Sequence, residues 1–331
     1  MIDEIRLAYA ALATHGAVGQ NGLITLPLPS ANGAYVGLDE QSHQHLLLET
    51  DVETEVNPEV TTLTVTNRHL NIEGREHLFL DVACLFGALS EVFDHFSAAV
   101  LQRMLTTSDS PATAVAGVLS GWRSFLTPPS GPPSLDKVSS VLGELLVVRD
   151  AVQQSGVVDI SFWTGPFGHR HDMRSKTTAL EVKTTRSHTG YRVTIHGEDQ
   201  LLPPEGVHLY LHLVRLESVH QGAVRLPALV DELLEVGVMA ERLFQALAAS
   251  GIGAADLPAT DSTAFEVRER VTVAVTDQTP RIVPGSFVDG QRPSGVVDIA
   301  YVIDLEGILD SAVGDAQYRE LTRSLATGVA S

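Results

Sequence analysis

The sequence predicts an α/β protein with a β-rich N-terminal part, a helical segment, a core of helix and strands, and a C-terminal α+β extension. Two observations lead to this fold class. The hydrophobic period changes along the chain between the two-residue alternation of strands and the spacing of helices. A proline-rich run from Thr127 to Pro133 cannot continue a helix and marks the clearest boundary. We therefore expect four parts, at residues 1–83, 84–133, 134–217 and 218–331.

The first two parts differ in hydrophobic period. From about Asn21 to Ala83, short apolar runs alternate with Gly, Asn and Pro, which is typical of a β-rich domain. Strands are expected there at 23–28, 34–38, 45–48, 61–66 and 77–82. From Cys84 to Leu126, apolar residues recur at helical spacing, which predicts packing helices.

The third part begins with a helix. An apolar stripe runs from Ser134 to Gln154, with Ser134 as its N-terminal cap. Glu144 lies at the edge of this stripe, an expensive place for a carboxylate unless a cation or a hydrogen-bond donor meets it. After this helix we expect, in order, a strand at 157–163, a turn at 165–168, a second strand carrying Asp172, a third strand at 178–184, and strands at 191–195 and 207–213.

Three residues of the third part suggest chemistry. Alternation along 178–184 places Glu181 and Lys183 on one face of their strand, and the hairpin places Asp172 beside Glu181. Mg²⁺ is held by one or two carboxylates, with water and substrate phosphate at its other positions. Asp172 and Glu181 can supply those carboxylates. Lys183 would then lie near the attacking water and the phosphate.

The fourth part carries no chemistry that the sequence reveals. An amphipathic helix is expected from Pro227 to Ser250, followed by strands near 265–275 and 295–303 and a short terminal helix. The chain contains no glycine-rich phosphate-binding loop with the required Lys. Any ATP-driven step would therefore belong to a partner.

Several short motifs follow one another in a characteristic order. They are Gly143-Glu144-Leu145-Leu146, Trp163-Thr164-Gly165-Pro166, His171-Asp172, Leu180-Glu181-Val182-Lys183-Thr184 and Asp199-Gln200-Leu201. In this order they resemble the PD-(D/E)XK nuclease superfamily and, more narrowly, a family of bacterial restriction-like proteins. One departure from the superfamily pattern is His171, which stands where Pro precedes the metal-binding Asp.

The resemblance implies a restriction-endonuclease-like fold, with a four-stranded mixed sheet flanked by helices. It also implies Mg²⁺-dependent cleavage of nucleic acid, with Mn²⁺ as an alternative ion. Asp172 and Glu181 would bind the metal with support from Glu144, and Lys183 and Gln200 would complete the catalytic set. The implied role is bacterial defence against foreign DNA, as a subunit of a restriction or anti-phage system beside a methyltransferase and a helicase-like ATPase.

Net charge constrains how such a protein meets DNA. The chain has 22 Lys and Arg against 41 Asp and Glu, a formal charge of −19, whereas proteins that grip a polyanion depend on basic side chains. Basic residues nevertheless outnumber acidic ones between His169 and Arg192. Four of them are predicted to contact substrate: Arg170, Arg174, Lys176 and Arg186. The alternative is an ordinary solvated hairpin. The acidic remainder favours a subunit that a partner loads onto DNA.

Other functional readings stay open. The chain could be a non-catalytic member of the same fold that binds DNA or acts as a scaffold, or an α/β interaction protein. His169 and His171 could begin a zinc site, but no third ligand is evident, so both are expected to be surface or turn histidines. A double-strand cut usually needs two copies and therefore a homodimer, whereas nicking needs one.

The cysteine content, the N-terminal sequence and the apolar runs indicate where in the cell the protein is expected. A single cysteine, Cys84, excludes an internal disulfide framework and agrees with a reducing cytoplasm. The N-terminus lacks the pattern of a signal peptide, and no apolar run is long enough to cross a membrane. We therefore expect a cytoplasmic protein with no membrane association.

Overall fold

The computed structural model describes residues 1–15, 22–127 and 131–329. The chain forms two compact units: Met1–Gly131 with Ile252–Pro258 form unit 1, and Pro132–Gly251 with Ala259–Ser331 form unit 2. Part of the predicted proline-rich linker, residues 128–130, lies outside the described residues. The division into four parts stays a prediction.

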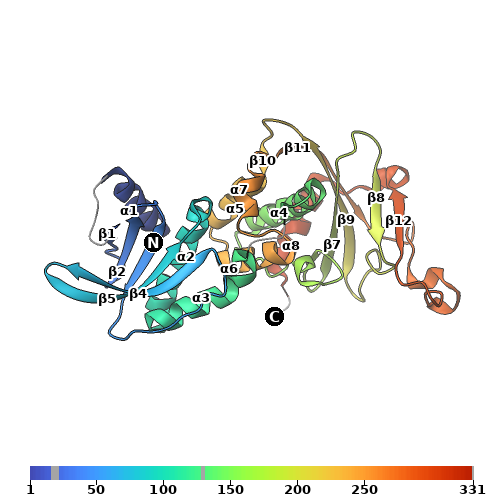
Figure 1. The fold of residues 1–331 in the computed structure, drawn as a ribbon. Helices are drawn as coiled ribbons and strands as arrows, with labels where there is room; N and C mark the ends of the chain where they lie inside the picture. Colours follow the sequence, from blue (N-terminus) through green and yellow to red (C-terminus); the bar gives the residue numbers. More distant parts are fainter. Residues whose placement is uncertain (16–21, 128–130, 330–331) are drawn as a thin grey trace. The chain divides into compact units, whose positions relative to one another are not determined.

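Unit 1 contains an antiparallel sheet with the order β1-β2-β3-β5-β4 (Figure 1). Its strands are β1 (Leu23–Pro27), β2 (Ala34–Asp39), β3 (Gln44–Glu49), β4 (Leu63–Ile72) and β5 (Arg75–Cys84). These strands confirm the β-rich prediction. Helix α1 (Ile2–His15), which precedes them, was not predicted.

Two helices follow the sheet in unit 1, as the helical spacing predicts. Helix α2 (Ser90–Thr107) packs against α3 (Pro111–Leu126), and the ring of Phe96 meets that of Trp122 edge-on at 5.8 Å between centroids. Ser110 caps α3 by accepting a hydrogen bond from the backbone N–H of Thr113. The unit also contains α7 (Asp256–Thr260, shared with unit 2 at its end) and the 3₁₀ turn η2 (Gly87–Leu89).

Unit 2 contains a mixed sheet with the order β10-β11-β9-β7-β6. Its strands are β6 (Met173–Arg174), β7 (Thr178–Thr185), β9 (His208–Ser218), β10 (Val224–Arg225) and β11 (Ala264–Ala274). Strands β7 and β9 run parallel, whereas the other pairs are antiparallel. The unit is therefore a mixed α/β structure, and its sheet has five strands in the described part of the chain instead of the expected four.

One face of this sheet is covered by helices. Helix α4 (Leu135–Ser155) is capped by Ser134 and packs against β7 and against α8 (Asp315–Thr327). The approach of α4 to the sheet is close, because a Cβ atom added at Gly143 would lie 2.3 Å from Cγ2 of Thr184. Glycine at position 143 thus allows the helix to rest directly on β7.

The other face is covered by a two-stranded ribbon of β8 (Arg192–His196) and β12 (Ala300–Asp304) (Figure 1). An apolar layer joins the ribbon to the sheet and is formed by Ala179, Val193, Ile195, Leu201, Leu209, Leu211, Leu213, Val273, Val275, Ile303 and Leu305. The remaining short elements are η3 (Gly165–Phe167), η4 (Pro284–Ser286), η5 (Val288–Gly290) and η6 (Glu306–Ser311).

Four predictions of secondary structure are wrong. The strand expected to carry Asp172 begins only after it, at Met173. Residues 157–163 form no strand, because the side chain of Asp159 accepts from the backbone N–H of Ser161 and a turn closes from Trp163 to Ile160. The helix expected at 227–250 is two helices, α5 (Leu226–Glu235) and α6 (Ala240–Ala249), broken where Gly237 adopts a φ of 101°. The strand expected at 295–303 begins only at Ala300. No helix in the described ranges is long and apolar enough to cross a membrane.

Candidate active site

The hairpin of β6 and β7 brings Asp172 beside Glu181, as predicted. Met173 pairs with Leu180, so Asp172, the residue before β6, lies next to Glu181 on β7. Oδ2 of Asp172 accepts a hydrogen bond of 2.7 Å from the backbone N–H of Val182. This bond holds the carboxyl group against β7.

Strand β7 presents Glu181 and Lys183 together. Lys183 Nζ lies 2.7 Å from Oε1 of Glu181, whose side chain is 1% exposed. The other oxygen of Glu181, Oε2, is buried and has no hydrogen-bond partner among the described residues. A buried carboxylate oxygen without a donor is costly, so this atom is available to a ligand.

Gln200 reaches the same place from the segment after β8. Its Oε1 accepts hydrogen bonds from Lys183 Nζ at 3.1 Å and from the backbone N–H of His196 at 2.8 Å. The side chain of Gln200 therefore ties the ammonium group of Lys183 to the end of β8. The structure brings together Asp172, Glu181, Lys183 and Gln200, although their functional roles stay a prediction.

Glu144 projects from α4 toward the same carboxyl groups. Its Oε2 accepts a hydrogen bond of 2.7 Å from Nε1 of Trp163, which is the donor that its place at the edge of the buried face requires. Burial, followed by the nearby Asp172, raises the pKa of Glu144 to about 8. Glu144 is therefore largely protonated near neutral pH.

The other two carboxyl groups are perturbed in the same direction. Burial, with the charge of Asp172 next, raises the pKa of Glu181 well above its usual value, and Lys183 opposes that rise. Burial also raises the pKa of Asp172, against the Val182 N–H and Lys183. Three acidic groups thus share a site with little water, where protons or a cation must offset their charge.

These donors fit a hard divalent cation. The described residues contain no group of three or more His, Cys, Asp or Glu side chains that could hold a metal ion. Mg²⁺ does not require such a cage, because water and substrate phosphate usually complete its coordination beside one or two carboxylates. Asp172 and Glu181 supply that number, and the unpartnered Oε2 of Glu181 is one available oxygen.

The turn before Asp172 has no room for a side chain. A Cβ atom at Gly165 would lie 2.7 Å from Oδ1 of Asp172 and 2.9 Å from its Cα. The backbone N–H groups of Thr164 and Gly165 both donate to the carbonyl oxygen of Asp172. Gly165 therefore helps set the position of Asp172. Sequence reasoning placed Gly165 in the turn and in a motif but did not identify this contact.

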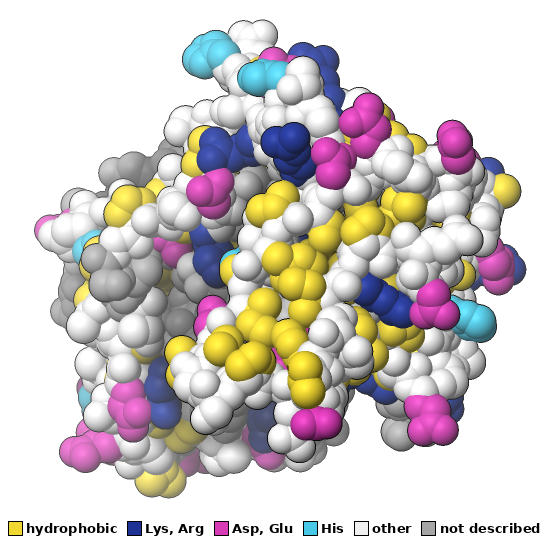
Figure 2. Space-filling model, turned by 90° about the vertical axis from the view of Figure 1, so that its right-hand side faces the viewer, with side chains coloured by type: hydrophobic (Ala, Val, Ile, Leu, Met, Phe, Trp, Pro, Cys, Tyr) yellow, Lys and Arg dark blue, Asp and Glu magenta, His cyan; other side chains and the backbone are white. Residues whose placement is uncertain are grey.

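The four predicted substrate contacts do not form one cluster. Lys176 precedes β7 and Arg186 follows it, so the length of an eight-residue strand, roughly 25 Å, separates them. Arg186 pairs with Asp136 at 2.5 Å, and Arg170 lies 4.0 Å from Asp199. Arg174 is exposed. On the face seen in Figure 2, Lys and Arg side chains are also scattered among acidic and hydrophobic ones. Substrate contact by these residues stays a prediction.

The prediction for the two histidines is wrong in one case. His169 is exposed, but His171 is 1% exposed, and neither ring nitrogen has a hydrogen-bond partner in the described part of the chain. Burial, aided by Arg170 and Arg174, lowers the pKa of His171 to about 4. The ring is therefore neutral near neutral pH. The segment bends at His171 instead of forming the expected strand, so alternation could not locate its side chain.

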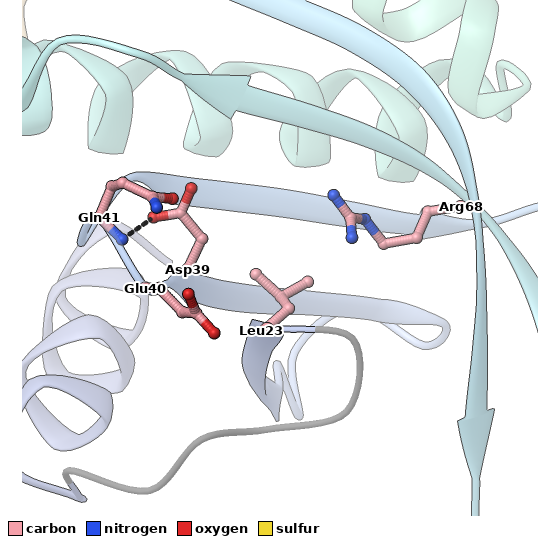
Figure 3. Close-up of a pocket in the computed structure, with 6 residues that line it drawn as sticks. Leu23, Asp39, Glu40, Gln41 and Arg68 are labelled. Atoms are coloured by element: carbon pink, nitrogen blue, oxygen red, sulfur yellow. Dashed lines mark hydrogen bonds between the residues drawn. The ribbon is translucent and has the colours of Figure 1, made fainter.

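A separate polar pocket of about 360 Å³ lies in unit 1, where Asp39, Glu40 and Gln41 stand across from Arg68 (Figure 3). Behind it, buried Asp81 accepts from Arg68 Nε at 2.6 Å and lies 2.8 Å from His45 Nδ1. These contacts join neighbouring strands and explain the burial of His45, to which the sequence assigned no role.

Comparison with known proteins identifies the family of this chain. A family model described as "Putative PD-(D/E)XK family member (DUF4420)" matches residues 5–306, a range that includes Glu144, Asp172, Glu181, Lys183 and Gln200. No curated protein and no solved structure matches the chain. Nucleases of the PD-(D/E)XK superfamily generally depend on divalent metal ions. The chain therefore belongs to this PD-(D/E)XK family.

Proposed function

We propose that the protein is an Mg²⁺-dependent endonuclease that hydrolyses phosphodiester bonds of DNA on a restriction-endonuclease-like core. The observation that supports this most strongly is the meeting of Asp172 and Glu181 with Lys183, whose ammonium group lies 2.7 Å from Glu181. A buried Glu, a partly buried Asp and a lysine on one sheet face match the chemical needs of phosphodiester hydrolysis.

Each residue has a distinct role in this proposal. Asp172 and Glu181 hold the divalent cation, and Glu144 supports them from α4. When bound, the cation makes water a better nucleophile and offsets charge on the phosphate. Lys183 directs its N–H groups toward the attacking water and the phosphate oxygens. Gln200 holds Lys183 in place through its 3.1 Å hydrogen bond.

The net charge of the chain bears on how it would reach DNA. A chain with a net charge of −19 gains little affinity from phosphate contacts. We therefore propose a cytoplasmic subunit of a restriction or anti-phage system, loaded onto DNA beside a methyltransferase and a helicase-like ATPase. Arg170, Arg174, Lys176 and Arg186 would contact the substrate backbone locally. A homodimer would be required for cutting both strands at one place.

The test is cleavage of supercoiled plasmid DNA by the purified protein with Mg²⁺, Mn²⁺ or EDTA. The proposal expects metal-dependent nicking or linearisation that is lost in Lys183→Ala and in Asp172→Ala. Lys137→Ala is the matched control, because Lys137 is an exposed residue in the first turn of α4. Its activity should equal that of the wild type.

Other outcomes count against the proposal. Cleavage that survives in both Lys183→Ala and Asp172→Ala would place the activity elsewhere or in a contaminant. Metal-independent DNA binding without cleavage, also in the presence of the methyltransferase and ATPase partners, would favour a catalytically inactive DNA-binding subunit.

A further inference from the structure

A second pocket lies on the helical face of the unit 2 sheet, opposite the face that carries Glu181 and Lys183. His212 on β9 lies beside Val182 of β7, whose side chain points toward α4. Its neighbours Leu211 and Leu213 point into the apolar layer on the other face. The pocket has a volume of about 290 Å³ and lies between α4, β9, β11 and the start of α8.

His212 lines this pocket with an unused polar atom. Its Nδ1 lies 2.7 Å from Oγ1 of Thr272, and its ring stacks on Tyr318 at 5.0 Å between centroids. The side chain is 1% exposed, and Nε2 has no hydrogen-bond partner among the described residues. When the Thr272 hydroxyl donates to Nδ1, Nε2 carries the proton and becomes a donor. A buried donor without an acceptor points to a ligand.

Arginines line the pocket beside two carboxylates, one of which already has several donors. Asp150 is already saturated, since it accepts from Arg149 at 3.0 Å, from Arg270 at 2.5 Å and from the Tyr318 hydroxyl at 2.9 Å. Arg319 is exposed on α8 and also lines the pocket. Asp315 is the remaining acidic residue of the lining. Two arginines, Arg270 and Arg319, and two carboxylates therefore line the pocket, and Arg149, from outside the lining, also pairs with Asp150.

The start of α8 adds backbone donors. The helix is 13 residues long, and its N-cap, Gly314, offers no side chain to the first-turn N–H groups. The backbone N–H of Val313 donates to the carbonyl oxygen of Thr272 at 2.8 Å, which fixes this helix end against β11. Free N–H groups at a helix N-terminus favour anions, and phosphate in particular.

We propose that this pocket binds the phosphate group of a small ligand, either free phosphate or a nucleoside monophosphate. The phosphate oxygens would accept from Arg270, Arg319, the first turn of α8 and Nε2 of His212. In a nucleotide, the ribose hydroxyls would donate to the carboxylate of Asp315. The pocket is separate from the proposed nuclease site, because it opens on the opposite face of the sheet.

The test is isothermal titration of the full chain in EDTA with inorganic phosphate and, separately, with AMP. At least one of the two should bind, and tighter binding of AMP would identify the nucleotide as the ligand. Arg319→Glu should weaken binding about tenfold or more, since it removes one charged donor and adds an acid. Arg323→Glu, one turn further along α8, is the matched control and should bind like the wild type. Glu181→Gln should also bind normally, which separates this test from that of the nuclease.

Three results would overturn the proposal. One is the absence of binding by both phosphate and AMP. Another is an equal loss of affinity in Arg319→Glu and Arg323→Glu, which would indicate only a general effect of charge. The third is an Arg319-dependent affinity for a DNA duplex without affinity for phosphate or AMP, which would assign this surface to DNA.

Discussion

Glu144→Gln should stabilise the metal-free protein, and the gain should grow with pH. The amide keeps an oxygen acceptor for Trp163 Nε1, which donates to Glu144 at 2.7 Å. The amide does not ionise, so the substitution removes the free-energy cost of ionising this carboxyl group in the folded protein. Because burial and Asp172 raise the pKa of Glu144 in the folded protein, folding retains a proton that the unfolded chain has lost.

The magnitude follows from the two pKa values. The pKa of Glu144 rises from its usual 4.5 to about 8 in the folded protein. Because this pKa is raised, the contribution of Glu144 to the free energy of unfolding is fully present below pH 4.5 and is lost as the pH rises through about 8. At about 1.4 kcal/mol for each pH unit, the free energy of unfolding lost is about 5 kcal/mol. Glu144→Gln should recover most of that loss at pH 9 and almost none at pH 4.

The assay is urea denaturation in EDTA at intervals from pH 4 to pH 9, for the wild type, Glu144→Gln and the exposed control Glu235→Gln. The difference between Glu144→Gln and wild type should widen by about 1.4 kcal/mol per pH unit between about pH 5 and pH 8. The control should show no such trend. A constant difference across the range would refute the burial of an ionisable carboxyl group at position 144.

Three further predictions concern packing and buried charge. Gly165→Ala should displace the Asp172 carboxyl group and abolish metal-dependent plasmid cleavage. Gly307→Ala is the control, because a Cβ atom there meets no atom within 4 Å. Equal cleavage by the two variants would contradict the close contact between Gly165 and Asp172. Asp81→Asn should lower the free energy of unfolding in urea by roughly 3–5 kcal/mol, because it removes the buried negative charge beside Arg68 and replaces one of the two acceptor oxygens with an NH2 donor. A change below about 1 kcal/mol would be inconsistent with that role. Gly143→Ala should destabilise by roughly 1–3 kcal/mol through its clash with Thr184, with partial rescue by Thr184→Ser in the same denaturation assay.

Alternation and helical spacing predicted most elements because each has one buried face. The strands of unit 1 and helices α2, α3 and α4 carry their apolar residues at those periods, and the structure confirms them. The strand prediction for residues 157–163 failed because Ile160 and Phe162 are buried in an irregular chain, whose pairing with β6 is limited to an isolated bridge between Trp163 and Met173. Helix α1 was missed although Ile5, Tyr9 and Leu12 have helical spacing and are buried.

The part of the site formed by the β6–β7 hairpin could be predicted from the sequence. The parts that other segments contribute were harder to predict. Register within the β6–β7 hairpin was enough to bring Asp172 to Glu181 and Lys183. Gln200 and the approach of Glu144 depend on tertiary packing, which only the family resemblance anticipated. The hydrogen bond from Trp163 to Glu144 and the close contact of Gly165 with Asp172 cross an irregular segment, for which no hydrophobic period exists.

Calorimetric titration with Mn²⁺ at pH 7, in buffers of different ionisation enthalpy, tests the metal site most directly. The wild type should bind Mn²⁺ and release protons, because the pKa of Glu144 is about 8 and that of Glu181 is raised well above its usual value in the metal-free protein. Binding should be lost in Glu181→Gln and Asp172→Asn and retained in Lys137→Ala. Binding without proton release, or with unchanged affinity in both Glu181→Gln and Asp172→Asn, would contradict a divalent-metal site at these two carboxylates.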